Sequence, residues 1–175
     1  MIREEDIREE KIIEIAKSMM VAARTAPKAR GRDNLVINLI IKEDILLLSK
    51  KMEEIYNENN QAFFLRDSQN ILNAKAIVLI GTKLEVLGLN CGLCGYPTCE
   101  EKSEHKTTPC VFNANDLGIA IGSAVSIAAD NRIDNRVMFS AGLAAKELGF
   151  FGEDIGFGFA IPLTSNGKNP FFDRQ

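Results

Sequence analysis

The 175-residue sequence predicts an α+β fold in which a mixed β-sheet is flanked by helices. Three observations lead to this expectation. Several segments repeat apolar residues at helical spacing, three other short runs are typical of strands, and the two kinds alternate only in part along the chain. No repeat, low-complexity tract or linker divides the sequence. Residues 1–175 are therefore expected to form one domain around a single core.

The first helix is supported by its spacing and by its ends. Ile12, Ile15 and Met19 lie three or four residues apart, as on one helical face. The first turns are acidic and Arg24 stands near the end, which suits the helix dipole, and Pro27 ends the helix. The predicted elements are helices at 4–25, 43–59, 63–74, 115–131 and 140–149 and strands at 34–42, 75–83 and 154–163.

The later elements rest on composition as well as spacing. The strand at 34–42 is apolar nearly throughout and is interpreted as buried on both faces. The helix at 115–131 is rich in small residues, so we expect a neighbouring element to pack closely against it. The C-terminal tail is rich in turn-forming residues but carries Phe171 and Phe172, which predicts that the tail docks on an apolar surface.

Composition narrows the class of protein. The net charge is −3 and the pI is about 5.3, which argues against a basic nucleic-acid-binding protein. The charged N-terminal stretch lacks the apolar region of a secretory signal, and the longest apolar run is shorter than the roughly 20 residues of a membrane span. We therefore expect a cytoplasmic protein with neither nucleic acid nor membrane as a partner.

All four cysteines fall in one loop, at about 88–112, with the spacing C-x2-C-x4-C-x10-C. In a reducing compartment such a cluster is more typical of metal ligands than of disulfides. Three thiolates within nine residues suit one face of an iron–sulfur cube, and a fourth arrives from the far side of the loop. The sequence therefore predicts a 4Fe-4S cluster on Cys91, Cys94, Cys99 and Cys110.

Three alternatives to this interpretation remain open. Structural zinc usually takes two C-x2-C pairs, of which the second is missing here, and disulfides or free thiols are the remaining choices. His105 lies between the third and fourth cysteines, where it would replace a ligand, tune the cluster by a hydrogen bond, or simply face solvent in a polar loop.

A group of basic residues marks a second candidate site. Arg24, Lys28, Arg30 and Arg32 fall within nine residues of an acidic protein. Such a group suits a phosphate-bearing ligand, but cations at the end of a helix and in a solvated loop give the same pattern. No Ser/His/Asp or H-E-x-x-H arrangement is present, so the sequence predicts no catalytic residue and leaves open whether the protein is an enzyme.

The stretch "CGLCGYPTC" resembles the 4Fe-4S motif in the large subunit of the corrinoid iron–sulfur protein and in subunits of electron-transport complexes. Over nearly its whole length the chain also resembles a prokaryotic family described as containing a ferredoxin domain. The stretches that carry this second resemblance are "AARTAPKARGRDNL", the cysteine loop, "DLGIAIGSAVSIAADNRIDNR" and "FAIPLTSNGKNPFFDR".

Other parts of the chain resemble FMN-dependent nitroreductases. The matching stretches are "VAARTAPKARGRDN", "DLGIAIGSAVSIAA" and "FGFAIPL". The resemblance implies an α+β fold in an intertwined homodimer with FMN at the interface. The early R-x-S-x-R motif of that family is absent, and Lys28 stands at the place of its serine. The residues that the resemblance places at the flavin are Arg24, Lys28, Arg30, Arg32, Asn34, Lys168 and Arg174.

Two classes of function follow. In the first, the protein is an iron–sulfur redox protein that carries one 4Fe-4S cluster and passes electrons to a flavin, to a small substrate or to a redox partner that the sequence does not identify. In the second, it is a cluster-bearing sensor or binding module without turnover, or a structural zinc protein.

Overall fold

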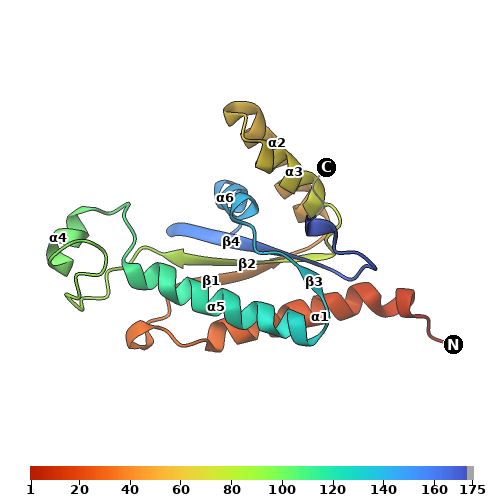
Figure 1. The fold of residues 1–175 in the computed structure, drawn as a ribbon, viewed down its shortest axis with the longest axis horizontal. Coiled ribbons are helices and arrows are strands. Elements are labelled where there is room, and N and C mark those ends of the chain that lie inside the picture. Colours follow the sequence, from red (N-terminus) through yellow and green to blue (C-terminus); the bar gives the residue numbers. More distant parts are fainter. Residues whose placement is uncertain (173–175) are drawn as a thin grey trace.

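A computed structural model describes residues 1–172 as a sheet with helices on both faces. In Figure 1, α1 and α5 cover one face of the sheet, and α2, α3 and α6 lie on the other. The elements in chain order are α1 (Glu4–Thr25), η1 (Ala29–Gly31), β1 (Leu35–Ile40), α2 (Glu43–Asn59), α3 (Ala62–Ile71), β2 (Ala76–Lys83), α4 (Cys99–Glu104), α5 (Val111–Asp130), β3 (Asp134–Asn135), α6 (Phe139–Glu147), β4 (Ile155–Thr164) and η2 (Pro170–Phe172).

The four strands form one open sheet in the order β1-β2-β4-β3. All three pairings are antiparallel. The predicted α+β class is confirmed, and within it the sheet is antiparallel throughout rather than mixed. Partial alternation of helices and strands does not fix strand direction. Here β2 begins at the end of the sheet where β1 finishes, and β4 begins where β2 finishes, so each strand runs opposite to the one it pairs with.

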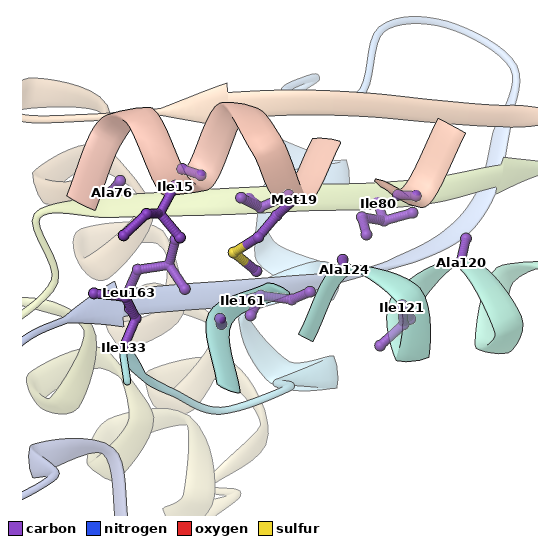
Figure 2. Close-up of a cluster of buried hydrophobic side chains, with 14 of the residues drawn as sticks. Ile15, Met19, Ala76, Ile80, Ala120, Ile121, Ala124, Ile133, Ile161 and Leu163 are labelled. Atoms are coloured by element: carbon purple, nitrogen blue, oxygen red, sulfur yellow. The ribbon is translucent and has the colours of Figure 1, made fainter. Parts of the chain in front are cut away.

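The central strand β2 separates two hydrophobic cores, one on each face of the sheet, where the sequence predicted a single core. Ala76, Val78 and Ile80 face the layer of α1 and α5, whereas Ile77 and Leu79 face the layer of α2, α3 and α6. This is the two-residue alternation of a strand that is buried on both faces. Figure 2 shows the first core, in which Ile15 and Met19 of α1 and three residues of α5 lie on the same face of the strands. Those residues of α5 are Ala120, Ile121 and Ala124.

The strand β1 differs from its prediction. It lies at the edge of the sheet and pairs only with β2. Leu35 and Ile40 are buried, but the four residues between them are only half-buried. An apolar edge strand and a central strand give the same sequence pattern, which explains the difference.

The C-terminal tail docks on its own chain, as predicted. Phe171 is fully buried in the second core, whereas Phe172 is 57% exposed with the Arg136 guanidinium over its ring. Asp67 of α3 anchors this region, because it accepts a hydrogen bond of 2.6 Å from Ser140 Oγ and pairs with Arg66 and Arg136. Arg136 in turn donates to the Phe171 carbonyl at 2.9 Å.

Helix α5 is the one helix in the described part of the chain that is long and apolar enough to cross a membrane. Length and composition alone give this result, and a core helix of a soluble protein meets the same condition. One side of α5 packs on α1 and β2 through Leu117, Ala120, Ala124 and Ala128. Its composition is thus explained by its place in the first core.

Candidate cysteine site

The cysteine segment connects the end of β2 to the start of α5. It extends beyond one end of the sheet, beside the first turn of α5 (Figure 1). Residues 84–98 have neither helix nor strand, and α4 is the only regular element before Cys110. The rigid body of the protein therefore holds the segment at its two ends, Lys83 and Val111.

All four cysteines line one narrow pocket, whose cavity volume of about 10 Å³ is roughly the space that one water molecule needs. Cys91 is exposed, Cys94 and Cys99 are half-buried, and Cys110 is buried, and none of the four forms a disulfide. The pocket is thus lined by thiols at graded depth, from the surface to the first turn of α5. Its wall also contains Leu87, Asn90, Tyr96, Lys102 and Phe112.

Left-handed backbone at two glycines shapes the loop that holds the first two thiols. Gly92 has φ +72° and Gly95 has φ +88°, conformations that L side chains rarely adopt. The Gly95 N–H donates to the Gly92 carbonyl at 3.0 Å and closes a tight turn around Cys94. The loop therefore needs glycine at these two positions.

Asn90 ties the start of the loop to Cys99. The Asn90 backbone N–H donates to Cys99 Sγ at 3.2 Å, and the Cys99 N–H donates to Asn90 Oδ1 at 2.7 Å. Hydrogen bonds to cysteine sulfur are a recognised means of tuning iron–sulfur centres. This contact orients Cys99 while its sulfur keeps lone pairs for a metal.

Cys110 is held at the N-terminus of α5. It is the N-cap residue, and its N–H donates to Asn113 Oδ1 at 3.1 Å. The positive end of the dipole of this 20-residue helix favours negative charge at that position. Cys110 is therefore placed to serve as a thiolate ligand.

The pocket offers four thiols as donors for a metal group. Within residues 1–172, no three His, Cys, Asp or Glu side chains converge on a point where one metal ion could bind. A structural zinc site needs four ligands within about 2.0–2.3 Å of one ion. In a four-iron cluster each thiolate binds a different iron, so thiols spread around a pocket suit that group.

The structure gives three of the four predicted phosphate-binding cations partners within the protein. Arg24 pairs with Asp33 at 2.6 Å and donates to the Leu35 carbonyl. Lys28 Nζ donates to carbonyls in and just after the last turn of α1, including that of Ala26 at 2.8 Å. Arg30 donates to the Leu87 carbonyl at 2.7 Å. The cluster of positive charge is thus largely used to shape the loop that follows α1.

The remaining predicted flavin residues that the structure describes do not form one group, because Lys168 lies away from Arg32 and Asn34. The exposed Arg32 side chain makes no hydrogen bond or ion pair within residues 1–172, and Asn34 is half-buried just before β1. Lys168 is exposed near the end of β4, and the register of β2 with β4 places that end away from the cysteine segment. Arg174 lies outside the described residues.

Asp33 is the acidic partner of this basic loop. Burial raises the pKa of its carboxyl, but hydrogen bonds from Arg24 and from the Leu35 N–H, with the charge of Lys28, bring the pKa below its usual value. Asp33 is therefore an anion that braces the loop, and not a general acid near neutral pH.

The basic loop lies against the base of the cysteine pocket. Besides the bond from Arg30 to Leu87, the Ala29 N–H donates to Asp116 Oδ2 on α5 at 3.0 Å. Leu87 lines the pocket, and Asp116 lies one and a half turns after Cys110. The predicted phosphate site and the cysteine site, which are far apart in the sequence, are therefore neighbours in space.

His105 lies outside the pocket wall. It is exposed, and its ring stacks on that of Tyr96, with 4.8 Å between the centroids. Tyr96 itself lines the pocket. The structure thus connects His105 to the site through a neighbouring ring rather than by direct approach to the thiols.

Sequence reasoning missed Asn90, Lys102 and the helix α4. The helix does have a signal in the sequence, because Thr98 is followed three residues later by Glu101 in the pattern of a capping box. In the structure the Glu101 N–H donates to Thr98 Oγ1 at 3.2 Å. No sequence pattern predicts the hydrogen bonds between Asn90 and Cys99 or the burial of Lys102.

Comparison with known proteins supports the resemblances to the ferredoxin-domain family and to the nitroreductases. Residues 106–174 match the family described as "Uncharacterized protein containing a ferredoxin domain". A protein of Archaeoglobus fulgidus, described as an uncharacterized protein, is 39% identical over 182 residues, which cover 99% of this chain and 97% of the relative.

Solved structures of nitroreductases and related flavoproteins share the fold. A nitroreductase with bound FMN from Desulfitobacterium hafniense has a TM-score of 0.61 at 15% identity, over 89% of this chain and 78% of its own. Nitroreductase CinD from Lactococcus lactis, in complex with chloramphenicol, has a TM-score of 0.65 at 14% identity, over 91% and 79%. A BluB-like flavoprotein from Clostridium difficile has a TM-score of 0.58 at 20% identity, over 89% and 81%. The chain belongs to the family described as containing a ferredoxin domain, and it has the nitroreductase fold.

Proposed function

We propose that this protein is an iron–sulfur redox protein that carries one 4Fe-4S cluster on Cys91, Cys94, Cys99 and Cys110. The observation that carries the proposal is that all four thiols line a single pocket. Such a cluster, when bound, accepts and donates single electrons. Membership of a family with a ferredoxin domain supports the same chemistry.

The protein's own residues prepare the pocket for this group. The bond from the Asn90 N–H to Cys99 Sγ and the helix N-terminus at Cys110 both favour thiolates. The side chains of Leu87 and Phe112 give the pocket an apolar wall that limits contact with water. Cys91 lies at the exposed rim, on the side where an electron would enter or leave.

Anaerobic purification with iron, sulfide, zinc and flavin analysis tests the proposal. We expect brown protein with about four irons and four sulfides per chain. Stoichiometric zinc without acid-labile sulfide would instead identify a structural zinc protein. A bound cluster that exchanges no electrons with mediator dyes would identify a sensor or binding module without turnover.

FMN is a second candidate cofactor, favoured by the fold and by the basic loop beside the cysteine pocket. The bond between Arg30 and Leu87 joins this loop to the pocket wall, so a flavin there would lie within reach of an electron from the cluster. Because Arg24, Lys28 and Arg30 already have partners, the contact with the flavin phosphate falls mainly to Arg32. A flavin at this site would make the protein a flavin-dependent oxidoreductase.

Fluorescence titration of cluster-loaded protein with FMN and with riboflavin tests the second candidate. Arg32→Gln should weaken FMN several-fold and leave riboflavin unchanged, because only FMN carries a phosphate. Lys17→Gln removes a charge from an exposed position of α1 and serves as the matched control. Absence of quenching by tens of micromolar FMN would leave the cluster as the only redox centre.

We also propose that the protein is a cytoplasmic homodimer joined through α5. The outward face of this helix carries Gly118, Ile119, Gly122 and Ser126, which leaves room for another backbone to approach. A Cβ at Gly122 would meet nothing within 4 Å in the monomer. Gly122→Leu should therefore keep the fold and shift the protein to monomer in light scattering. A wild-type protein that is monomeric at micromolar concentration would count against the dimer.

A further inference from the structure

Lys102 is buried in the wall of the cysteine pocket. Its exposure is 2%, although lysine is almost never fully buried unless it is paired. It lies on α4, three residues after Cys99, and therefore on the same side of that helix. Of the residues that line the pocket, Lys102 is the only one whose side chain carries a full charge apart from the thiols themselves.

The ammonium group lacks an acidic partner within residues 1–172. Its one hydrogen bond goes to the His105 carbonyl at 3.2 Å, whereas an ammonium has three protons to donate. The ion pairs of the described chain do not include it. A buried charge without a counter-ion is costly, so a negative group in the pocket is expected to balance it.

We infer that Lys102 is the counter-ion of the cysteine site and that it raises the reduction potential of the cluster held there. This inference rests on the function proposed above. Reduction adds one electron from a one-electron donor and makes the site one unit more negative, without breaking a bond. A fixed positive charge in a poorly solvated wall stabilises the more negative state, so it favours reduction.

Three variants separate the charge of Lys102 from its packing. Lys102→Gln removes the charge and keeps most of the stem, whereas Lys102→Arg keeps the charge. Lys106→Gln removes an exposed lysine from the same loop and is the control for general electrostatics. Each protein is purified without oxygen, assayed for iron and sulfide, and titrated with dithionite in the presence of mediators, with the reduced cluster followed by electron paramagnetic resonance.

We expect Lys102→Gln to disfavour reduction about tenfold, which corresponds to a potential about 59 mV lower for one electron. Lys102→Arg and Lys106→Gln should stay close to wild type. Loss of the cluster from Lys102→Gln, with retention in Lys102→Arg, would also support the inference, because it shows that the site requires the charge.

The inference is overturned if Lys102→Gln keeps both the cluster and the wild-type potential, or if both Lys102 variants lose the cluster, which would assign the residue to packing. Neither result would affect the proposed function, since the wild-type protein would still hold iron and sulfide. Wild-type protein without sulfide would instead refute the proposed function itself.

Discussion

The body of the protein and the cysteine segment 84–110 are held together by different interactions. In the body, two hydrophobic cores cover both faces of the sheet, and five consecutive residues of β2, Ala76 to Ile80, are fully buried. In the segment only Leu87, Lys102 and Cys110 are buried, and single hydrogen bonds set its shape. Hydrophobic burial therefore suffices for the body, whereas the segment depends on local contacts and on whatever its thiols bind.

The largest effect should follow from removing one thiol. Cys99→Ser keeps the size of the side chain but replaces a thiolate ligand, so the iron content should fall from about four per chain to nearly none. Hydrogen exchange in residues 84–110 should then speed up by orders of magnitude, because the bound group no longer closes the loop. The strands β1, β2 and β4 should keep the protection of the wild type.

Ser103→Ala is the matched control, because Ser103 lies on the same helix and its hydroxyl donates only to the Cys99 carbonyl. This variant should retain iron and slow exchange. If Cys99→Ser instead lowers protection throughout the sheet, the segment and the body form one cooperative unit and the contrast between them is wrong.

A smaller effect, confined to the body, is expected at Asp67. This buried carboxylate binds Ser140 and two arginines, so Asp67→Asn keeps its shape but removes the charge that both guanidinium groups face. The free energy of unfolding should fall by about 1.5–3 kcal/mol, the usual range for hydrogen bonds to charged groups. Chemical denaturation measures this change, and the iron content should remain that of the wild type.

Asp130→Asn serves as the control for Asp67, since Asp130 is exposed at the end of α5. It should change stability by less than about 0.5 kcal/mol. Loss of iron in Asp67→Asn would show that the anchor of the C-terminal tail also supports the distant cysteine segment, and the two regions would then not be independent.

The same contrast explains how much the sequence could predict. The helices at 4–25 and 43–59 were predicted with the bounds that the structure has, because each has an amphipathic pattern and clear ends. Helix α5 begins at Val111 rather than at 115, since Asn113 accepts the N–H of Cys110 and extends the helix by a turn. Helices that pack in a core can thus be predicted from the spacing of their apolar residues.

Only part of the candidate site could be predicted from the sequence. Cysteine spacing predicted the four thiols as ligands, because metal chemistry restricts which residue types serve in that role, and the structure brings all four to one pocket. The predicted phosphate cluster was less informative, since Lys28 caps α1 and Arg24 pairs with Asp33. Those partners depend on where the chain folds back, and no local pattern shows it. Lys102 illustrates the same limit, because its burial is a property of the pocket and not of α4 alone.

The smallest effect is expected where the basic loop joins the two regions. Asp33→Asn keeps the hydrogen bond from the Leu35 N–H but removes the ion pair with Arg24. Both side chains are partly exposed, so the free energy of unfolding should fall by only about 0.2–1 kcal/mol at neutral pH. The effect should also depend on pH, because the folded protein lowers the pKa of Asp33.

A group with a lowered folded-state pKa stabilises the protein fully above its unfolded-state pKa, which is about 3.9 for aspartate. The stabilisation is lost as the pH falls through the still lower folded-state pKa. The difference in stability between wild type and Asp33→Asn should therefore be constant from pH 7 to about pH 5 and shrink below pH 4. Asp154→Asn, at an exposed turn, is the control. A difference that persists unchanged to pH 2 would mean that Asp33 acts through the shape of the loop and not through its charge.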